Sequence, residues 1–236
     1  MISGKAFMKE CRWSYDSRYP PATFSFPAAN TGDTVFLNGD YVKDFASGLY
    51  RFPRKYFTFV VHNSDQQFDK QKLDMLLPFA QHIYSINTTV THPKLTTIPL
   101  GFPDRDLEWL ATYEPSNVER TVPVYMNFTI RTNYQARSAC FNAFPNAEHD
   151  PPELNRPEYY RRLESAQFVP CPEGTGIDTH RFYEALYCGA TPVVLRSCPL
   201  VSFYEQFPCC IVDSWTDPLV APPRKPVTFS VRDYLQ

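Results

Sequence analysis

The sequence has no apolar run long enough to cross a membrane, and its first residues, MISGKAFMKECRW, lack the continuous apolar segment of a signal peptide. The formal net charge is only −2 at pH 7, which removes any global electrostatic reason to bind nucleic acid or an anionic membrane. The sequence therefore predicts a soluble, cytoplasmic chain with no membrane span and no nucleic-acid partner. A local basic site is still compatible with this charge balance.

Signatures of metal and classical nucleotide sites are also missing. The seven cysteines form an odd set without a Cys-x-x-Cys pair or zinc-type histidine spacing, and we interpret them as reduced thiols. Neither Gly-x-Gly-x-x-Gly nor the P-loop pattern occurs, which argues against a classical dinucleotide fold or a P-loop protein. Only 8 glycines stand against 23 prolines, so we expect stiff connections between elements. No metal or organic cofactor is predicted.

What the sequence does contain is a series of short apolar runs, each followed by polar residues. In the first half, four runs are typical of buried strands: 33–40, 56–65, 82–87 and 94–102. Residues 68–80 have helical spacing between the second and third runs. A strand, a helix and a strand in succession are the parallel unit of an α/β fold.

The second half repeats this organisation. Strands are predicted at 122–128, 166–172, 191–195 and 209–215, and helices at 133–144 and 179–189. We therefore expect two α/β domains, residues 1–115 and 116–236, divided within the polar connection 111–121. In open α/β sheets the ligand lies beyond the carboxyl ends of the strands, so the residues after each strand are the candidates for a site.

One such segment, CPEGTGIDTHRFYEALYCGATPVVL (171–195), combines glycines and polar residues at a predicted helix start. If Asp178 or Thr179 caps this helix, its first backbone N–H groups and its dipole favour an anion beyond the preceding strand. Gly174 and Gly176 have no Cβ, so the backbone could approach a phosphate closely.

Arg181 and Glu184 are three residues apart and therefore share one face of this helix. The arginine could grip a diphosphate, and the carboxylate could accept hydrogen bonds from two ribose hydroxyls. The alternative from spacing alone is an ordinary surface ion pair, with glycines that merely turn the chain.

The segment EGTGIDTHRFYEALYCGATPVVL, with FVPCP before it and FPCCIVDSW after it, resembles the sugar-nucleotide-binding half of exostosin-like glycosyltransferases. Their pattern is roughly G-x-D-T-x-R-x-x-E-A-L-x-x-G-x-x-P-V-V. HPKLTTIPLGF is similar to the segment before the interdomain connection of these enzymes. YMNFTIRTNYQAR resembles the first strand and phosphate-side loop of their C-terminal domain. The resemblance covers about residues 82 to 215 and is specific over 166–195.

This resemblance implies a GT-B architecture, in which two Rossmann-like domains face each other across a cleft. The C-terminal domain would hold a UDP- or GDP-sugar, and the N-terminal domain would face a glycan acceptor, without a metal. The implied donor contacts are Arg181 to the diphosphate, Glu184 to the ribose, Asp178, Thr179 and His180 at the helix start, Gly176 in the loop, and Arg131 and Arg137 to phosphate. Retaining enzymes often carry a glutamate eight residues before the ribose-binding one; Gly176 stands there, which favours inversion.

Inverting transfer needs a base that takes the proton from the acceptor hydroxyl. Such a base is expected at a strand end of the N-terminal domain, where His62 and Asp65 follow the second strand, with Asp40 and Asp16 as further candidates. Asp65 is slightly favoured, because a lone histidine can equally be a hydrogen-bonded residue of a buried turn.

Two other functions are compatible with the sequence. Asp104 and Asp106 form an Asp-x-Asp triplet like the one that holds Mn²⁺ in GT-A enzymes, although no long apolar strand precedes it. A non-catalytic nucleotide-sugar or glycan-binding module could instead stack sugar rings on aromatic side chains near the N-terminus. The residues concerned are Trp13, Tyr15, Tyr19 and Phe24.

Overall fold

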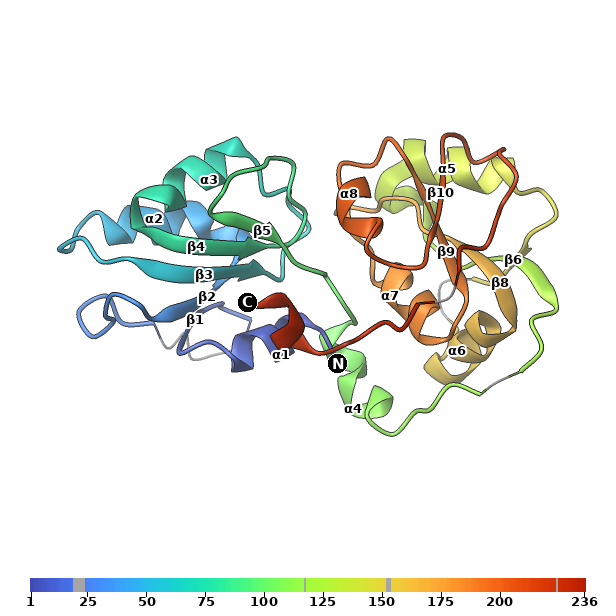
Figure 1. Cartoon of the computed structure of the whole chain (residues 1–236), viewed down its shortest axis with the longest axis horizontal. Helices are drawn as coiled ribbons and strands as arrows, with labels where there is room; N and C mark the ends of the chain where they lie inside the picture. The colour runs from blue at the N-terminus through green and yellow to red at the C-terminus, as the bar shows by residue number, and fades with distance from the viewer. Residues whose placement is uncertain (19–23, 117, 152–153, 224) are drawn as a thin grey trace. The chain divides into compact units, whose positions relative to one another are not determined.

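The computed structural model describes residues 1–18, 24–116, 118–151, 154–223 and 225–236. The chain divides into two compact units (Figure 1). Unit 1 contains Met1–Asp104 and Phe229–Gln236, and unit 2 contains Arg105–Thr228. Each unit has a five-stranded sheet in which every strand pair described is parallel. The predicted α/β class is confirmed, and the two sheets are compatible with Rossmann-like domains.

The strands of unit 1 follow each other across the sheet in chain order. They are β1 (Trp13–Tyr15), β2 (Thr34–Asn38), β3 (Phe57–His62), β4 (Ala80–Ser85) and β5 (Leu95–Thr97). The helices are α1 (Gly4–Lys9), α2 (Val42–Leu49) and α3 (Lys70–Leu76). Because right-handed crossovers that advance in one direction stay on one side of a sheet, α2 and α3 cover the same face (Figure 1).

The core of unit 1 lies between this face and the two helices. Val35 and Leu37 of β2 pack there with Phe45 of α2, all with no exposed surface. Side chains alternate along a strand, so Phe36 points to the opposite face. There its ring and that of Phe7 from α1 both lie beside His62.

The C-terminal segment Phe229–Gln236 belongs to unit 1, although residues 116–236 were expected to form one C-terminal domain. Phe229 places its ring 5.4 Å from that of Phe102, and Arg232 forms an ion pair with Glu10 at 3.6 Å. The hydroxyl of Tyr84 donates to the carbonyl of Gln236 at 2.8 Å. Unit 1 is therefore built from both ends of the described chain.

Unit 2 contains β6 (Val122–Met126), β7 (Glu148–His149), β8 (Ala166–Pro170), β9 (Thr191–Leu195) and β10 (Cys210–Val212). Its helices are α4 (Leu107–Leu110), α5 (Tyr134–Ala143), α6 (Arg156–Ser165), α7 (His180–Tyr187) and α8 (Val201–Tyr204). The order across the sheet is β10-β9-β8-β6-β7. Counted along the chain from β6, this is the 2-1-3-4-5 order of a doubly wound sheet.

The direction of winding in unit 2 reverses between β6 and β8. The chain leaves β6 toward β7 on one side, then returns across β6 to place β8 on the other side. Right-handed connections therefore put α5 on one face of the sheet and α6 and α7 on the opposite face. On the α5 face, Cys140 packs with Val193 and Trp215 in a buried cluster. All seven cysteines are free thiols, as predicted.

The boundary between the units lies about ten residues earlier than predicted, because the connection packs onto unit 2. Asp106 forms an ion pair with Arg156 of α6 at 2.9 Å. Trp109 packs its ring 4.9 Å from that of Tyr160, and the hydroxyl of Tyr113 donates to the buried Glu164. Polar composition indicated a linker at 111–121, but Tyr113 within it and Trp109 just before it anchor the connection to α6.

Candidate anion site in unit 2

The candidate site lies where the winding of the second sheet reverses. β6 and β8 are neighbours there, and the chain continues from their carboxyl ends into the loops that begin at Asn127 and Cys171. In doubly wound sheets this place accommodates ligands, because the two flanking loops diverge to opposite faces. The strand order needed to locate the reversal cannot be read from the sequence, but the loops themselves were predicted.

Two arginines converge on one aromatic ring in these loops. The guanidinium of Arg181, from α7, lies 5.2 Å from the ring centre of Phe128, and that of Arg137, from α5, lies 5.6 Å from it. Both distances fall within the range of cation–π contacts. Phe128 is the second residue after β6, so its ring holds both cations near the carboxyl end of that strand.

Backbone carbonyls hold the two guanidiniums in place. Arg137 donates from Nη1 to the carbonyl of Thr129 at 2.9 Å and from Nε to that of Glu173 at 3.1 Å, which ties the loop after β6 to the loop after β8. Arg181 donates from Nη2 to the carbonyl of Asn127, whereas its Nε is buried without a hydrogen-bond partner among the described residues. A donor is thus left unused beside the ring.

The two arginines of this pair lie outside the ion pairs of the described residues. Among the residues that the structure describes, no carboxylate forms an ion pair with Arg137 or Arg181. Burial, and then the nearby charge of Arg181, lower the pKa of Arg137 to about 10, so Arg137 is still cationic at neutral pH. Two unpaired cations held close together repel each other, and a bound anion would relieve this repulsion.

Gly174 completes the cradle around Arg137. A Cβ at this position would lie 2.5 Å from Nη2 of Arg137, so a side chain could be accommodated only by displacing the guanidinium. The N–H of Gly174 donates to the carbonyl of the buried Gly176 at 2.9 Å, which closes the loop on itself. Both glycines therefore shape the loop around Arg137. The sequence predicted a different role for them, a close approach of the backbone to a phosphate.

The start of α7 adds a second unpartnered group. Thr179 is the N-cap residue, but its side chain makes no capping hydrogen bond, and its buried Oγ1 has no partner within the described residues. The positive end of the helix dipole favours an anion at such a start. His180 is half-buried in the first turn, and Arg131 is exposed in the 3₁₀ turn Ile130–Asn133.

Asp178, for which the resemblance implied a donor contact, directly precedes the N-cap residue of α7. It is buried, and it accepts hydrogen bonds from the hydroxyls of Tyr183 and Tyr204, at 2.5 and 2.9 Å. Its Oδ1 also accepts from the N–H of Thr179 at 2.8 Å. These tyrosines come from α7 and α8, so the role visible for Asp178 is to fasten the loop to the two helices.

Glu184 is buried as well, with only 4% of its surface exposed, and the hydroxyl of Tyr159 from α6 donates to its Oε2 at 2.7 Å. The interpretation of Arg181 and Glu184 as a surface ion pair is therefore wrong. Burial and then the Glu184 carboxylate raise the pKa of Tyr159, while the charge of Arg181 acts in the opposite direction. Arg181 and Glu184 thus share one electrostatic environment without pairing.

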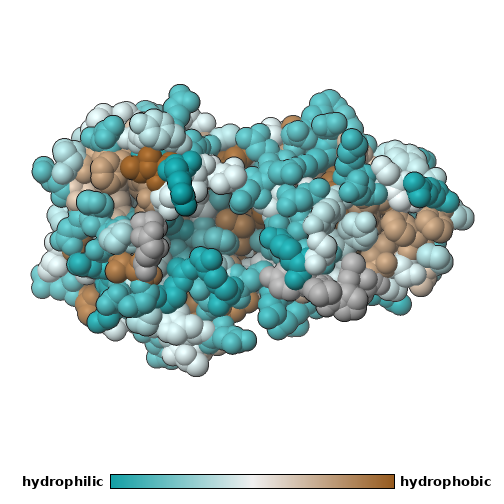
Figure 2. Space-filling model, turned by 180° about the vertical axis from the view of Figure 1, so that it is seen from behind, coloured by the Kyte–Doolittle hydropathy of each residue, from teal (hydrophilic) through white to brown (hydrophobic). Residues whose placement is uncertain are grey.

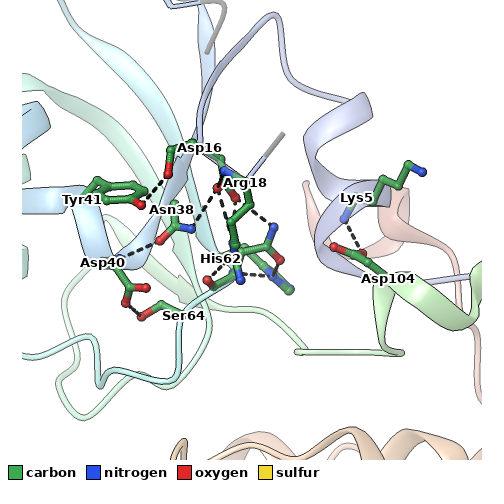
Figure 3. A network of polar contacts seen from close by, with 11 residues as sticks. Lys5, Asp16, Arg18, Asn38, Asp40, Tyr41, His62, Ser64 and Asp104 are labelled. Carbon is green, nitrogen blue, oxygen red and sulfur yellow. Dashed lines mark hydrogen bonds and ion pairs between the residues drawn. The ribbon is translucent and has the colours of Figure 1, made fainter. Parts of the chain in front are cut away.

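The residues proposed as a base lie in unit 1, at the carboxyl edge of its sheet (Figure 3). His62 is buried between aromatic rings, and its Nδ1 accepts the N–H of Asn63 at 2.7 Å. Its Nε2, which then carries the proton, lies 3.3 Å from the carbonyl of Pro99. Both ring nitrogens are engaged, as in the alternative of a satisfied buried histidine. Asp65 is exposed.

Asp16 is the centre of the polar network in Figure 3. It has no exposed surface, and it accepts hydrogen bonds from the side chains of Asn38 and Asn63, both at 3.1 Å, and from the N–H of Arg18 at 2.9 Å. Burial alone would raise its pKa, but the hydrogen bonds outweigh burial and the pKa is lowered. Asp16 therefore fastens the ends of β1, β2 and β3 and is a poor base. Asp40, the other further candidate for the base, accepts a hydrogen bond from the hydroxyl of Ser64.

The residues behind the two alternative functions, the Asp-x-Asp triplet and the N-terminal aromatic side chains, contact other residues of the protein. Asp104 accepts the N–H of Lys5 at 2.7 Å, and Asp106 is held by Arg156. Within the described residues, no group of three or more histidine, cysteine or acidic side chains could hold a metal ion. The aromatic rings of Trp13, Tyr15 and Phe24 pack against the core of unit 1. Tyr19 lies outside the described residues.

On the face shown in Figure 2, hydrophobic residues form small groups separated by hydrophilic ones. Among the described residues, no helix combines the length and apolar character needed to span a bilayer. Comparison with models of known protein families and with curated protein sequences returned no match. A proposal of function consequently rests on the geometry around Phe128, Arg137 and Arg181 and on the sequence resemblance of residues 166–195.

Proposed function

We propose that the chain is a glycosyltransferase that uses a nucleotide-sugar donor, with the donor diphosphate bound by Arg137 and Arg181. The observation that carries this proposal is the arginine pair without a carboxylate partner, among the described residues, at the winding reversal of unit 2. The pair supports a ligand with more than one negative charge, and the resemblance of residues 166–195 to exostosin-like enzymes supplies the reaction class. The GT-B arrangement of the two units belongs to the same proposal.

In this reaction an acceptor hydroxyl attacks the anomeric carbon, a new carbon–oxygen bond forms, and the bond to the diphosphate oxygen breaks. Negative charge builds on the leaving phosphate as the bond breaks. A guanidinium can make two parallel charge-assisted hydrogen bonds to that phosphate, and these strengthen in the transition state. With two fixed cations and the dipole of α7, the protein itself supplies the counter-charge, so we expect transfer to continue in the presence of EDTA.

The acceptor proton needs a base, and we assign this role to Asp65 in the inverting reaction. Asp65 follows β3 and is exposed, whereas both nitrogens of His62 are engaged within unit 1. Replacement of Asp65 by asparagine would keep the shape of the side chain and remove its basicity.

The first test is calorimetric titration of the whole protein with UDP, GDP and inorganic pyrophosphate, followed by assays of UDP- and GDP-sugar hydrolysis and transfer with and without EDTA. Arg137→Gln should weaken binding of all three anions about tenfold or more, since it removes a charge-assisted contact. Arg161→Gln, an exposed arginine on α6, is the matched control and should change nothing. Equal affinity of the Arg137 variant and the parent would contradict the site. Tight binding of the nucleotides without hydrolysis or transfer of a nucleotide-sugar would favour the alternative of a non-catalytic binding module.

Glu184 allows the ribose contact to be separated from the diphosphate contact. Glu184→Gln preserves the volume and can still accept the hydroxyl of Tyr159, but a neutral amide is a weaker acceptor for two ribose hydroxyls. We expect UDP or GDP affinity to fall about fivefold to tenfold. Inorganic pyrophosphate, which has no ribose, should bind the variant as it binds the parent.

Tyr159→Phe is the control for the structural part of the Glu184 effect. It removes the internal hydrogen bond and leaves the carboxylate, so nucleotide affinity should be retained while the melting temperature falls. If Glu184→Gln weakens pyrophosphate and nucleotide equally, Glu184 acts only on the fold of the site and does not contact the ribose.

A further inference from the structure

The connection between α2 and β3, residues 50–56 with the sequence YRFPRKY, exposes three aromatic side chains within seven residues. Tyr50, Phe52 and Tyr56 retain 63%, 39% and 41% of their surface. Single exposed aromatic residues need no partner, but several on one short connection are typical of an interaction surface.

The same connection concentrates positive charge. Arg51 and Arg54 are exposed, and neither forms an ion pair with a described residue. No aspartate or glutamate occurs from residue 45 to residue 64. A chain of net charge −2 therefore carries a local cationic segment that contains no acidic residue of its own.

Two of the three aromatic residues pack against rings of neighbouring elements. Phe52 stacks on Phe26 with ring centres 5.2 Å apart and planes 9° apart, and Tyr50 packs edge-on against Phe79 at 4.8 Å. Lys55 donates from Nζ to the carbonyl of Pro27 at 3.2 Å, which fastens the segment to the preceding loop. A preorganised surface loses little conformational freedom when it binds.

We propose that residues 50–56 dock the chain onto an anionic lipid surface. Tyrosine and phenylalanine at such a surface place their rings at the headgroup boundary, while arginines contact lipid phosphates. The segment precedes β3 (Figure 1). It therefore lies at the opposite end of that strand from its last residue, His62. Docking there would leave the carboxyl edge of the unit 1 sheet uncovered. The proposal does not depend on the glycosyltransferase assignment.

The test is co-sedimentation of the full chain with vesicles of phosphatidylcholine alone or with about 30 mol% phosphatidylserine. We expect binding to the anionic vesicles, with a loss of about tenfold in partition coefficient for Arg51→Gln/Arg54→Gln and for Tyr50→Ser/Tyr56→Ser. Lys9→Gln/Lys43→Gln removes the same charge from exposed positions of unit 1 and should retain binding.

Equal binding of all variants, or binding to neither vesicle, would overturn the proposal. The same holds if a single-stranded RNA oligonucleotide binds through Arg51 and Arg54 and the anionic vesicles do not compete with it. Far-ultraviolet circular dichroism of each variant verifies that the altered side chains left the fold intact. The arginine variant should pass this test, because its side chains form no ion pair with a described residue.

Discussion

Replacing Arg181 by alanine should lower the turnover of sugar transfer on the order of 10²- to 10³-fold, the scale seen when a preorganised donor to a developing negative charge is removed. In the structure Arg181 stands over Phe128, anchored through one nitrogen to the carbonyl of Asn127, with Nε unbound among the described residues. In the proposed reaction, the hydrogen bonds from Arg181 to the leaving phosphate strengthen in the transition state. The variant should therefore lose more in turnover than in donor affinity.

Lysine and a remote arginine provide the controls. Arg181→Lys keeps the charge but loses the fork of donors, and it should retain part of the activity. Arg161→Ala, on the exposed side of α6, should transfer sugar at the parental rate. An Arg181→Ala protein that remains folded and matches the parental turnover would remove Arg181 from the reaction.

The largest effect on stability is expected for Gly101→Ala. Gly101 has φ of +70°, a conformation that costs an L-residue roughly 1–2 kcal/mol, and its added Cβ would lie 2.3 Å from the carbonyl oxygen of Ile2. That carbonyl accepts the N–H of Phe102 at 2.9 Å, so backbone must move to relieve the overlap. We expect a loss of about 3–4 kcal/mol in the free energy of unfolding, measured by urea denaturation.

Gly32→Ala separates the two causes of this loss. Gly32 also has a positive φ, +94°, but no described atom outside its chain neighbours lies within 4 Å of the place an added Cβ would occupy, so only the backbone conformation is strained. It should lose roughly 1 kcal/mol. Similar losses in the two variants would mean that the approach of Gly101 to Ile2 is not tight.

Periodicity located most of the sheet, because buried parallel strands are continuous apolar runs. The run predicted at 191–195 is β9 within the same bounds, and 166–172 contains β8. The prediction missed β7 and β1, which are two and three residues long. It also missed α6, whose residues are mostly polar, as well as α2 and the short helices α1, α4 and α8. The order of the strands across each sheet was not predicted. It depends on which strands pair, and local sequence patterns carry no information on pairing.

The candidate site was predicted in part. The position of Arg181 at the start of a helix after a strand was sufficient to propose an anion contact, and the resemblance implied a second contact from Arg137. The structure places both arginines beside Phe128, which was not predicted. The directions of Asp178 and Glu184 were not foreseeable from spacing. Each carboxylate takes a tyrosine hydroxyl as partner, and those tyrosines include residues on other helices, 25 and 26 positions away.

The return of Phe229–Gln236 to unit 1 has a consequence for how the protein is made. Unit 2 is one continuous stretch, whereas unit 1 needs a segment that a ribosome synthesises after all of unit 2. Although domains generally fold in the order of synthesis, the first unit to emerge is here the last that can be completed. Until then Phe102 and Tyr84 lack their partners from this segment, so the nascent first unit exposes apolar surface for as long as elongation of the second unit lasts.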